Sequence, residues 1–393
     1  MLLEPQEYPS FVKYMGSKSK IMEFVLEGIN EIYTGGPVLD LFAGSASLSG
    51  AIAQQSAVQS NDIQRYSSIL AKVYSQSYRN ARYPNVHQLL DRAEKIVQAN
   101  ALPLLSTLDY QKIHDLKSFN AIEKMSQNLI DHTFQHGWHL FSKNYSGTWW
   151  SYEQCLWIDA IREIAEDYRK TPAYEPILAC LMFAMAYASQ GTGHYAQYRD
   201  AKTDSSLKDI IIYRRRSIRD YFQRKFEQLA EWLPSKKPTL NHKQSSLGFE
   251  KCLTSFEGGT VYADPPYCFV HYSRFYHALE TLVLYDYPEL QVKAGKVVKG
   301  RYRVDRHQSP FCIKTQVKGA FRSLFQGVVD SKSNLAMSYS NSGMISIEEV
   351  HELAMEFFKN RRVEVLLTGH QHMTLGRLKD RHREVQECLL LVK

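Results

Sequence analysis

The chain has 393 residues, of which 44% are hydrophobic and 23% are charged, and its formal net charge is +7. This length and composition are typical of a soluble globular protein of about two domains and exclude a disordered chain. The sequence contains no run of about eighteen apolar residues and no CxxC pair, so it predicts neither a membrane span nor a zinc ribbon or disulfide framework.

Residues 10–64 predict helices that alternate with short buried strands. A helix is expected at 19–33, where apolar residues recur at helical spacing until a Gly-Gly-Pro stop. The stretch PVLDLFAG predicts a buried strand, SASLSGAIAQQ a helix of small residues, and AVQSND a second strand that closes on an acid. Such alternation is typical of a doubly wound parallel sheet.

Residues 66–205 lose this rhythm and are rich in helix formers, histidine and aromatic residues. We expect helices at 110–132 and 179–189 and a loop at 144–150. From about Tyr213 the alternation returns, with a basic amphipathic helix at 213–233 and strands at 261–263, 334–340, 363–369 and the C-terminus. The sequence therefore predicts one α/β domain, residues 1–65 and 206–393, interrupted by a mostly helical insertion at 66–205.

The segment from Val38 to Gly50, VLDLFAGSASLSG, predicts a strand, a turn of small residues and a helix. Small residues at the carboxyl end of a parallel strand let a nucleotide approach the backbone closely. The turn is not a GxGxxG motif, because Ala46 replaces the middle glycine. Asp62 follows Asp40 by about twenty residues, where an acid would hold ribose hydroxyls, although acids at strand ends are also common without such a role.

Two further stretches place chemically active groups beside predicted elements. FVKYMGSKSK puts two lysines near a helix start with Ser17 as a possible cap; the helix dipole disfavours these lysines, which indicates a ligand or a nucleic acid. TVYADPPYCF ends a strand with Pro265 and Pro266, which stiffen a loop that presents Asp264, carbonyl groups and Tyr267. Taken alone, this loop is equally consistent with a simple turn.

A basic run extends from Gln291 to Arg322, with nine Lys or Arg residues and one acid, Asp305. A solvated surface would explain it, but its place soon after the double proline and the positive net charge favour phosphate contacts. Between them, residues 271–288 interleave aromatic residues with Arg274 and predict either a loop over the site or a core helix. The histidines at 132, 136 and 139 have helical metal spacing without an acid or cysteine partner, so we expect no metal.

The order FVKYMGSK, DLFAGSAS, SND, helical insertion and DPPY resembles the Dam-like, α-group DNA adenine N6-methyltransferases over the whole chain in outline. The resemblance implies a Rossmann-like domain that binds S-adenosylmethionine (SAM), with the insertion as target-recognition region. It implies these cofactor-binding residues: Tyr14, Lys18, Asp40, Phe42, Ala43, Gly44, Asp62, Ile63 and Asp264. Asp264, Pro265, Pro266 and Tyr267 match the catalytic motif.

The chain departs from the family pattern in two places. Ala46 stands where a glycine is usual, which should tighten the turn without abolishing it. The segment before DPPY lacks the acid often found near the SAM adenine, and Gln244 or Ser245 is the expected substitute. The segment from Ser338 to Asn341 is expected to rim the pocket.

The chemistry implied by the resemblance needs these residue types. Adenine N6 is a weak nucleophile, and Asp264 and the Pro265 carbonyl could accept its two hydrogens so that its lone pair localises. The base must be flipped out of the duplex, and Tyr267 could stack on it. Phosphate contacts are expected from the following basic residues: Arg274, Lys299, Arg301, Arg303 and Arg306.

The sequence thus predicts a site-specific adenine N6-methyltransferase acting on double-stranded DNA in a restriction-modification or related defence system, with a cognate endonuclease as a possible partner. The resemblance implies a nucleoid-associated protein of bacterial or phage origin. We expect it in the cytoplasm, because MLLEPQEYPS is no secretory signal. The alternatives are a cytosine-N4 or RNA-adenine methyltransferase, or a catalytically silent DNA-binding subunit. The sequence does not indicate the recognition site or the oligomeric state.

Overall fold

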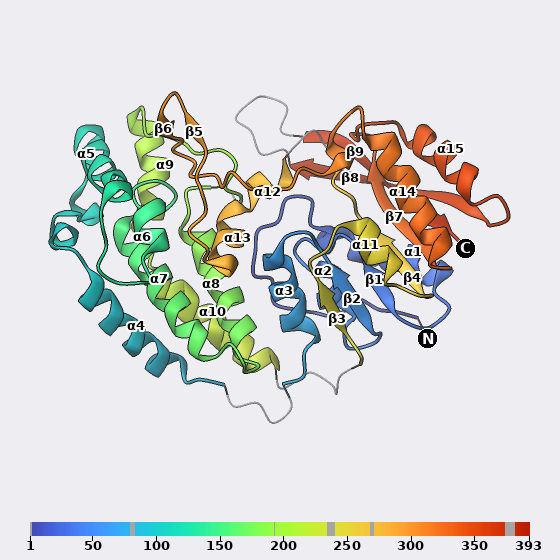
Figure 1. The fold of residues 1–393 in the computed structure, drawn as a ribbon, viewed down its shortest axis with the longest axis horizontal. Coiled ribbons are helices and arrows are strands. Elements are labelled where there is room, and N and C mark those ends of the chain that lie inside the picture. Colours follow the sequence, from blue (N-terminus) through green and yellow to red (C-terminus); the bar gives the residue numbers. More distant parts are fainter. Residues whose placement is uncertain (1, 79–82, 192, 234–239, 268–270, 374–381) are drawn as a thin grey trace.

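The computed structural model describes residues 2–78, 83–191, 193–233, 240–267, 271–373 and 382–393, with backbone alone for 368–373 and 382–386. Figure 1 shows a sheet with its helices on one side of the molecule and a layer of helices on the other. Within the described residues, every helix is too short or too polar to cross a membrane.

A seven-stranded sheet forms the first part, in the order β3-β2-β1-β4-β7-β9-β8. Its strands are β1 (Val38–Asp40), β2 (Val58–Asn61), β3 (Lys243–Ser245), β4 (Thr260–Ala263), β7 (Asn334–Ser340), β8 (Val363–Met373) and β9 (His382–Val392). Neighbours pair in parallel except β9, which is antiparallel to β7 and β8. The carboxyl ends of β1, β2, β4 and β7 therefore meet at one edge, and the prediction of a doubly wound α/β sheet is confirmed.

Helices cover both faces of this sheet because side chains alternate along each strand. On one face, Tyr262 and Ala336 pack with α1 (Met22–Ile32) and α2 (Ser47–Ile52). On the other, Val261 and Leu335 pack with α11 (Phe249–Thr254), α14 (Val317–Asp330) and α15 (Ile347–Phe357). Two apolar cores on opposite faces thus fix the edge where the functional groups gather.

The helical layer has its own core, centred on α8 (Tyr174–Ala188), in which every residue but Tyr187 is buried. Around it lie α3 (Arg65–Ser75), α4 (Val86–Asn100), α5 (Leu116–Gln127), α6 (Leu140–Asn144), α7 (Tyr152–Asp167), α9 (Asp204–Arg214), α10 (Ile218–Trp232) and α13 (His277–Leu284). The loop predicted at 144–150 is found at 145–150, because Asn144 is the last residue of α6, and it buries Trp149 and Trp150. Short elements α12 (Tyr272–Phe275), β5 (Val292–Lys293) and β6 (Lys296–Val297) complete this side (Figure 1).

Three expectations about these elements need correction or sharpening. The single helix expected at 213–233 is two helices, because the Ser217 side chain accepts a hydrogen bond from Asp220 N and starts α10 afresh. Both α9 and α10 pack on α8, so the chain continues in the helical layer beyond residue 205, while the domain boundary expected there stays a prediction. Residues 271–288 were expected to form either a loop over the site or a core helix. The part that forms α13 is a core helix, because Leu279 and Leu282 are buried, whereas Arg274 on α12 is exposed.

Candidate active site

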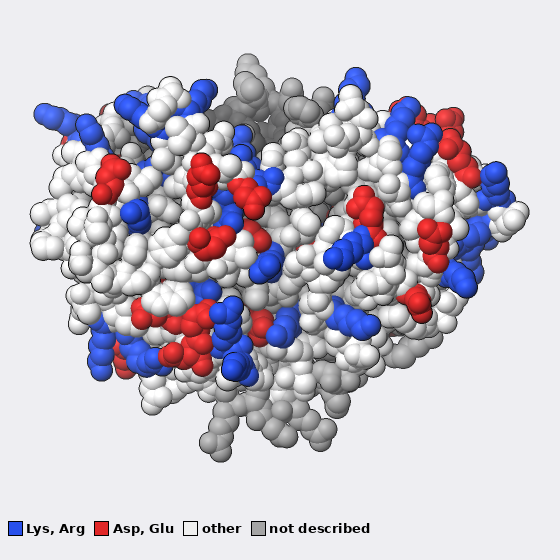
Figure 2. Space-filling view, in the orientation of Figure 1, with Lys and Arg blue, Asp and Glu red and all other residues white. Residues whose placement is uncertain are grey.

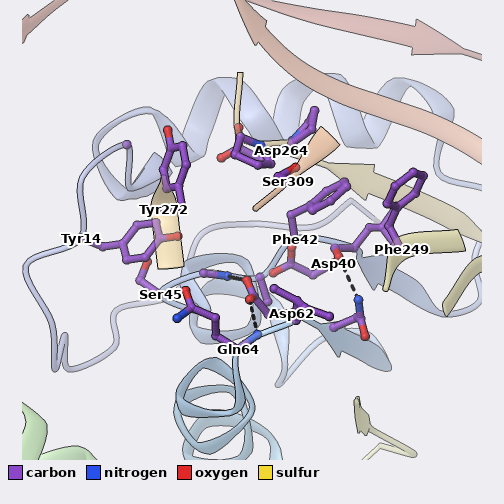
Figure 3. A pocket seen from close by; sticks show the side chains of 18 of the residues that line it. Tyr14, Asp40, Phe42, Ser45, Asp62, Gln64, Phe249, Asp264, Tyr272 and Ser309 are labelled. Carbon is purple, nitrogen blue, oxygen red and sulfur yellow. Dashed lines mark hydrogen bonds between the residues drawn. The ribbon is translucent and has the colours of Figure 1, made fainter. Parts of the chain in front are cut away.

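A cavity of about 290 Å³ opens at the carboxyl ends of β1, β2 and β4. In the close view of Figure 3, Asp264 lies across this cavity from Asp62, with Tyr14 on one side and Phe42 on the other. Every residue that the sequence indicated for the cofactor or the catalytic motif lines it, from four segments of the chain: Tyr14, Lys18, Asp40, Phe42, Ala43, Gly44, Asp62, Ile63, Asp264, Pro265, Pro266 and Tyr267. Their roles remain predictions, but the fold brings them together.

The turn after β1 forms despite the missing glycine. Ala46 adopts a left-handed conformation with φ of +57° and its N–H donates to the Ala43 carbonyl at 2.6 Å. Gly44 is also left-handed, and a Cβ there would lie within 2.9 Å of atoms of the Tyr14 ring. Glycine at 44 is therefore required for the N-terminal motif to close against the turn.

Asp62 is held by the backbone around it. Its Oδ2 accepts from Gly44 N and its Oδ1 from Gln64 N, each at 2.9 Å (Figure 3). Burial raises the pKa of Asp62 to about 6, although both backbone hydrogen bonds lower it. Each carboxylate oxygen can accept more than one hydrogen bond, so Asp62 keeps capacity for hydroxyl donors from a ligand.

Asp40 adds a second buried carboxyl group to the same cavity. Burial raises the pKa of Asp40 well above its ordinary value, and repulsion by Asp264 and Asp62 raises it further. Among the described residues that line the cavity, Lys18 is the only lysine or arginine, whereas four residues carry a carboxyl group: Asp40, Asp62, Glu250 and Asp264. This excess of acid favours a ligand that carries positive charge.

Lys18 enters the cavity from the start of a short helical turn, Lys18–Ile21, capped as expected by the Ser17 side chain. It is 5% exposed, and its Nζ lies 3.2 Å from Asp264 Oδ1 and 3.5 Å from Glu387 Oε2. Burial alone would lower the pKa of Lys18, but the attraction of Asp264 and Glu387 raises it overall. The position of this lysine near a helix start is thus explained by two carboxylates and not by the helix.

Tyr267 follows the double proline and is largely buried. Its hydroxyl donates to Glu387 Oε1 at 3.0 Å, and its ring packs edge-on against Tyr339 with ring centres 5.6 Å apart. Sequence reasoning missed Glu387, although an acid directly before the apolar run CLLLV was a signal. Lining residues that it missed include Leu247, Gly248, Phe249, Tyr272, Ser273, His307, Ser309 and Pro310.

Two expectations about the cavity wall are not met. Gln244 Nε2 donates to Ser75 Oγ and Ser245 Oγ donates to Asn61 Oδ1, both at 2.7 Å, so the expected substitutes are engaged in the sheet edge. The segment 338–341 does not line the cavity; the Ser338 hydroxyl instead pairs with the Tyr262 hydroxyl at 2.8 Å.

The residues expected to contact DNA phosphates divide into two groups. Arg303 is 4% exposed and pairs with Asp286 through both Nη atoms, at 2.8 and 2.7 Å, and Arg301 is 5% exposed. In this conformation neither reaches solvent, so neither is positioned to contact a phosphate.

The other basic residues lie nearer the surface. Lys299 Nζ pairs with Asp200 at 2.6 Å, and the guanidinium groups of Arg274 and Arg306 lie 4.3 and 5.6 Å from the centre of the Tyr302 ring. Positive and negative side chains are interspersed on the face in Figure 2. Within the described part of the chain, no group of three or more His, Cys, Asp or Glu side chains could hold a metal ion.

Comparison with known proteins bears on this cavity. The model of the D12 class N6 adenine-specific DNA methyltransferases matches residues 14–351. Modification methylase LlaI of Lactococcus lactis subsp. lactis is 22% identical over 97% of this chain and 55% of its own length. Type II methyltransferase M.FokI of Planomicrobium okeanokoites is 24% identical over 87% of this chain and 46% of its own, and modification methylase StsI of Streptococcus sanguinis is 20% identical over 97% and 52%. The chain thus spans about half the length of these relatives.

Proposed function

The chain belongs to the D12 class N6 adenine-specific DNA methyltransferases, and we propose that it transfers a methyl group from SAM to adenine N6 in double-stranded DNA. The observation that carries this proposal is the placement of Asp264 and its proline loop in the same cavity as the Asp62 carboxylate. A cofactor held by Asp62 and a base held by Asp264 would share one enclosed space.

The residues of the cavity fit SAM. Asp62 has acceptor capacity for ribose hydroxyls, and Phe42, Leu247 and Phe249 supply an apolar wall for an adenine ring. The excess of carboxyl groups over Lys18 suits a ligand with a sulfonium and an ammonium group. When bound, SAM supplies an electrophilic methyl group on its sulfonium.

The chain's own residues prepare the nucleophile. The Asp264 side chain is 19% exposed and aligned by Lys18, so one carboxylate oxygen can accept an N6 hydrogen while the Pro265 carbonyl accepts the other. The two prolines fix both acceptors before the reaction, which avoids reorganisation in the transition state. The N6 proton becomes acidic once the nitrogen is alkylated, so a strong general base is not required.

We assign recognition of the duplex to the helical layer. The target base must leave the stack at a cost of about a few kcal/mol, and stacking on Tyr267 would return about 1–3 kcal/mol. Arg274, Arg306 and Lys299 lie at or near the surface of this side and are the candidates for phosphate contacts. Arg301 and Arg303 act as supports of the layer.

The biological setting follows the relatives, whose names are modification methylase and type II methyltransferase. A role in restriction-modification with a cognate endonuclease, in the cytoplasm, is part of the proposal. Asp264 in place of a serine favours adenine over cytosine N4, and the retained Asp264, Lys18 and Asp62 cluster favours an active enzyme over a silent subunit.

Incubation of the purified protein with tritiated SAM and three substrates tests this function: mixed-sequence DNA, duplexes of G and C only, and RNA duplexes. We expect label in N6-methyladenine from mixed DNA alone, and loss of label in Asp264→Ala but not in Asp330→Ala, an exposed acid at the end of α14. Label in the G and C duplex or in RNA would favour the alternatives. Absence of N6-methyladenine, or full activity of Asp264→Ala, would overturn the proposal.

A further inference from the structure

Glu387 is a buried charged residue next to the apolar end of β9. It is 1% exposed, and the residues after it on β9, Cys388 to Val392, are all buried. Removing a carboxylate from water is costly unless partners compensate. The Glu387 carboxylate therefore needs polar partners that compensate for its burial.

The register of the sheet places Glu387 against two residues that line the cavity, Lys18 and Tyr267. Because β9 runs antiparallel to β7, Glu387 lies opposite Ser340, the last residue of β7. Glu387 thus lies at the edge of the sheet where β4 ends and the proline loop begins. Strand alternation puts it on the same face as Leu389 and Leu391, which pack with α1, and Lys18 precedes α1 on that face.

Two cavity residues depend on this one carboxylate. Its Oε1 accepts the Tyr267 hydroxyl at 3.0 Å, while its Oε2 lies 3.5 Å from Lys18 Nζ. The same Nζ is 3.2 Å from Asp264 Oδ1 and 5.3 Å from the centre of the Tyr267 ring. Glu387 therefore links the expected stacking ring to the cation that aligns the expected acceptor.

The division of Lys18 between two acids has a chemical consequence. A lysine paired with Asp264 alone would compete with the adenine amino group for the Asp264 oxygens. A second carboxylate draws part of that positive charge away and leaves Asp264 a better acceptor, since hydrogen bonds to charged groups respond strongly to their counter-ions.

We propose that Glu387 is a positioning residue for N6 methylation, which fixes the Tyr267 ring and shares Lys18 with Asp264 so that Asp264 can accept an N6 hydrogen. This inference rests on the proposed function.

The test compares Glu387→Gln, which keeps an acceptor for Tyr267 but removes the charge, with Cys388→Ala on the opposite face of β9. The substrate is a duplex that the wild type methylates, and the readouts are the single-turnover rate, the Kd of SAM and the fluorescence of 2-aminopurine at the target base. We expect Glu387→Gln to lower the rate about 10- to 100-fold with a SAM Kd within about 3-fold of wild type. Cys388→Ala should keep the rate within about 3-fold.

Tyr267→Phe separates the two contacts, because it removes only the hydroxyl that donates to Glu387. It should reduce the 2-aminopurine signal, and the combined Tyr267→Phe and Glu387→Gln variant should lose less than the product of the single losses. A Glu387→Gln rate equal to wild type, or a loss of rate accompanied by equal losses of SAM affinity and thermal stability, would overturn the inference.

A second experiment does not depend on activity, so it distinguishes failure of this inference from failure of the proposed function. In the ligand-free protein, urea unfolding of Glu387→Gln, Lys18→Met and the double variant measures the coupling between the two charges. We expect the double variant to unfold at a higher midpoint than the two single shifts predict. Additive shifts would overturn the inference even if the wild type methylates adenine, whereas a wild type that makes no N6-methyladenine, with coupled shifts, would overturn the proposed function alone.

Discussion

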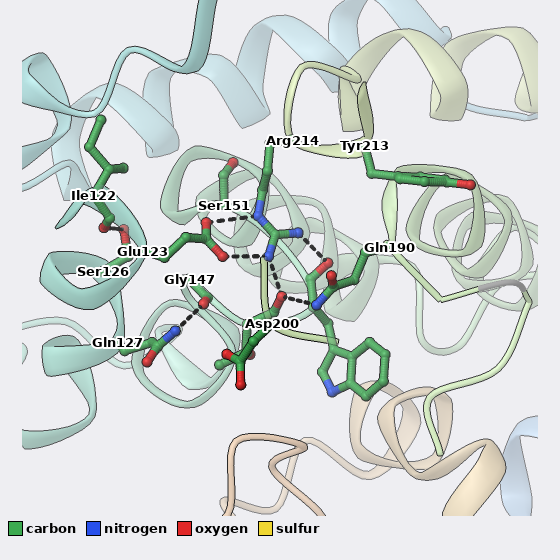
Figure 4. Close-up of polar contacts among 12 residues, drawn as sticks. Ile122, Glu123, Ser126, Gln127, Gly147, Ser151, Gln190, Asp200, Tyr213 and Arg214 are labelled. Atoms are coloured by element: carbon green, nitrogen blue, oxygen red, sulfur yellow. Dashed lines mark hydrogen bonds and ion pairs between the residues drawn. The ribbon is translucent and has the colours of Figure 1, made fainter. Parts of the chain in front are cut away.

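A buried positive side chain lies in each part of the molecule, Arg214 in the helical layer and Lys18 at the sheet edge. The two differ in how completely the charged groups around them are paired. In the helical layer, Arg214 forms two hydrogen bonds with Glu123, at 2.9 and 2.7 Å, and also donates to the carbonyls of Trp149 and Thr148 (Figure 4). Tyr110 donates to the same Glu123 at 2.7 Å. One cation meets one anion there, and neighbouring groups occupy the remaining positions.

At the sheet edge, Lys18 serves both Asp264 and Glu387, while Asp40 and Asp62 share the cavity. Burial raises the pKa of Asp40 and Asp62 because no adjacent cation compensates fully. A saturated cluster stabilises a fold, whereas a cluster with surplus acid and open space is suited to a cationic ligand. We therefore expect the Arg214 charge to be structural and the Lys18 charge to serve the proposed function.

The largest effect on stability should come from breaking the saturated pair. Arg214→Met leaves Glu123 buried without its counter-ion, which should lower the free energy of unfolding by about 3–5 kcal/mol. Urea unfolding measures this change, and the fraction that remains folded should bind SAM with unchanged affinity. Weaker SAM binding by folded Arg214→Met would contradict a purely structural role.

Asp264→Asn should have the opposite profile. It preserves shape but weakens the acceptor, so the methylation rate should fall about 100- to 1000-fold while the urea midpoint stays close to wild type. Single-turnover methylation and urea unfolding on the same preparation check both. If Asp264→Asn were destabilised but still active, Asp264 would have a structural role like that of Glu123, and the proposed difference between the two clusters would be wrong.

The surplus acid also predicts a pH dependence. The pKa of Asp62 in the folded protein is about 6, above its unfolded value, so its contribution to stability falls as pH rises from about 4 to 6. Hydroxyl donors bind the ionised form, so the Kd of SAM should decrease as pH rises through the folded pKa, from about pH 5 to 7, and level off above about pH 7.

Titration of SAM affinity between pH 5 and 8 measures this, with Asp62→Asn as control. The variant should bind SAM about 10-fold more weakly at pH 7.5 and show a flatter profile. Asp159 in the helical layer, with a pKa raised by burial to about 7, titrates in the same range. It faces Phe141, Ser142 and Tyr285 and not the cavity, so it should affect stability without affecting SAM binding. Equal pH profiles for the wild type and Asp62→Asn would remove Asp62 from the cofactor site.

The smallest effect should come from an exposed pair. Asp200→Ala removes the partner of Lys299 on the helical side, where both side chains are at least one-third exposed. The free energy of unfolding should change by about 0–1 kcal/mol. A loss of unfolding free energy comparable to that of Arg214→Met would mean that burial does not explain the large contribution of the Arg214–Glu123 pair to stability.

Local signals explain what the sequence could predict. The strands at 261–263 and 334–340, the turn after Asp40 and the proline loop are encoded by short apolar runs, small residues and prolines, and the parallel sheet then brings their ends together. The cofactor and catalytic candidates at the ends of β1, β2 and β4 line the cavity for this reason.

Long-range pairing explains what the sequence could not predict. Glu387 reaches Lys18 and Tyr267 only through the register of β9 against β7, and Arg303 is buried because it pairs with Asp286 and packs into the helical layer. A basic run looks solvated until its partners are known. The division of helix 213–233 had a local signal, the Ser217 cap with Asp220 three residues later, which outweighs the continuous amphipathic pattern.

The most direct test of the central claim is a single assay of N6-methyladenine in duplex DNA for wild type, Asp264→Asn and Arg214→Lys, each normalised to its folded fraction. We expect methylation by the wild type, methylation within about 3-fold by Arg214→Lys and a loss of about 100-fold or more in Asp264→Asn. No N6-methyladenine from the wild type, or equal losses in both variants, would contradict it.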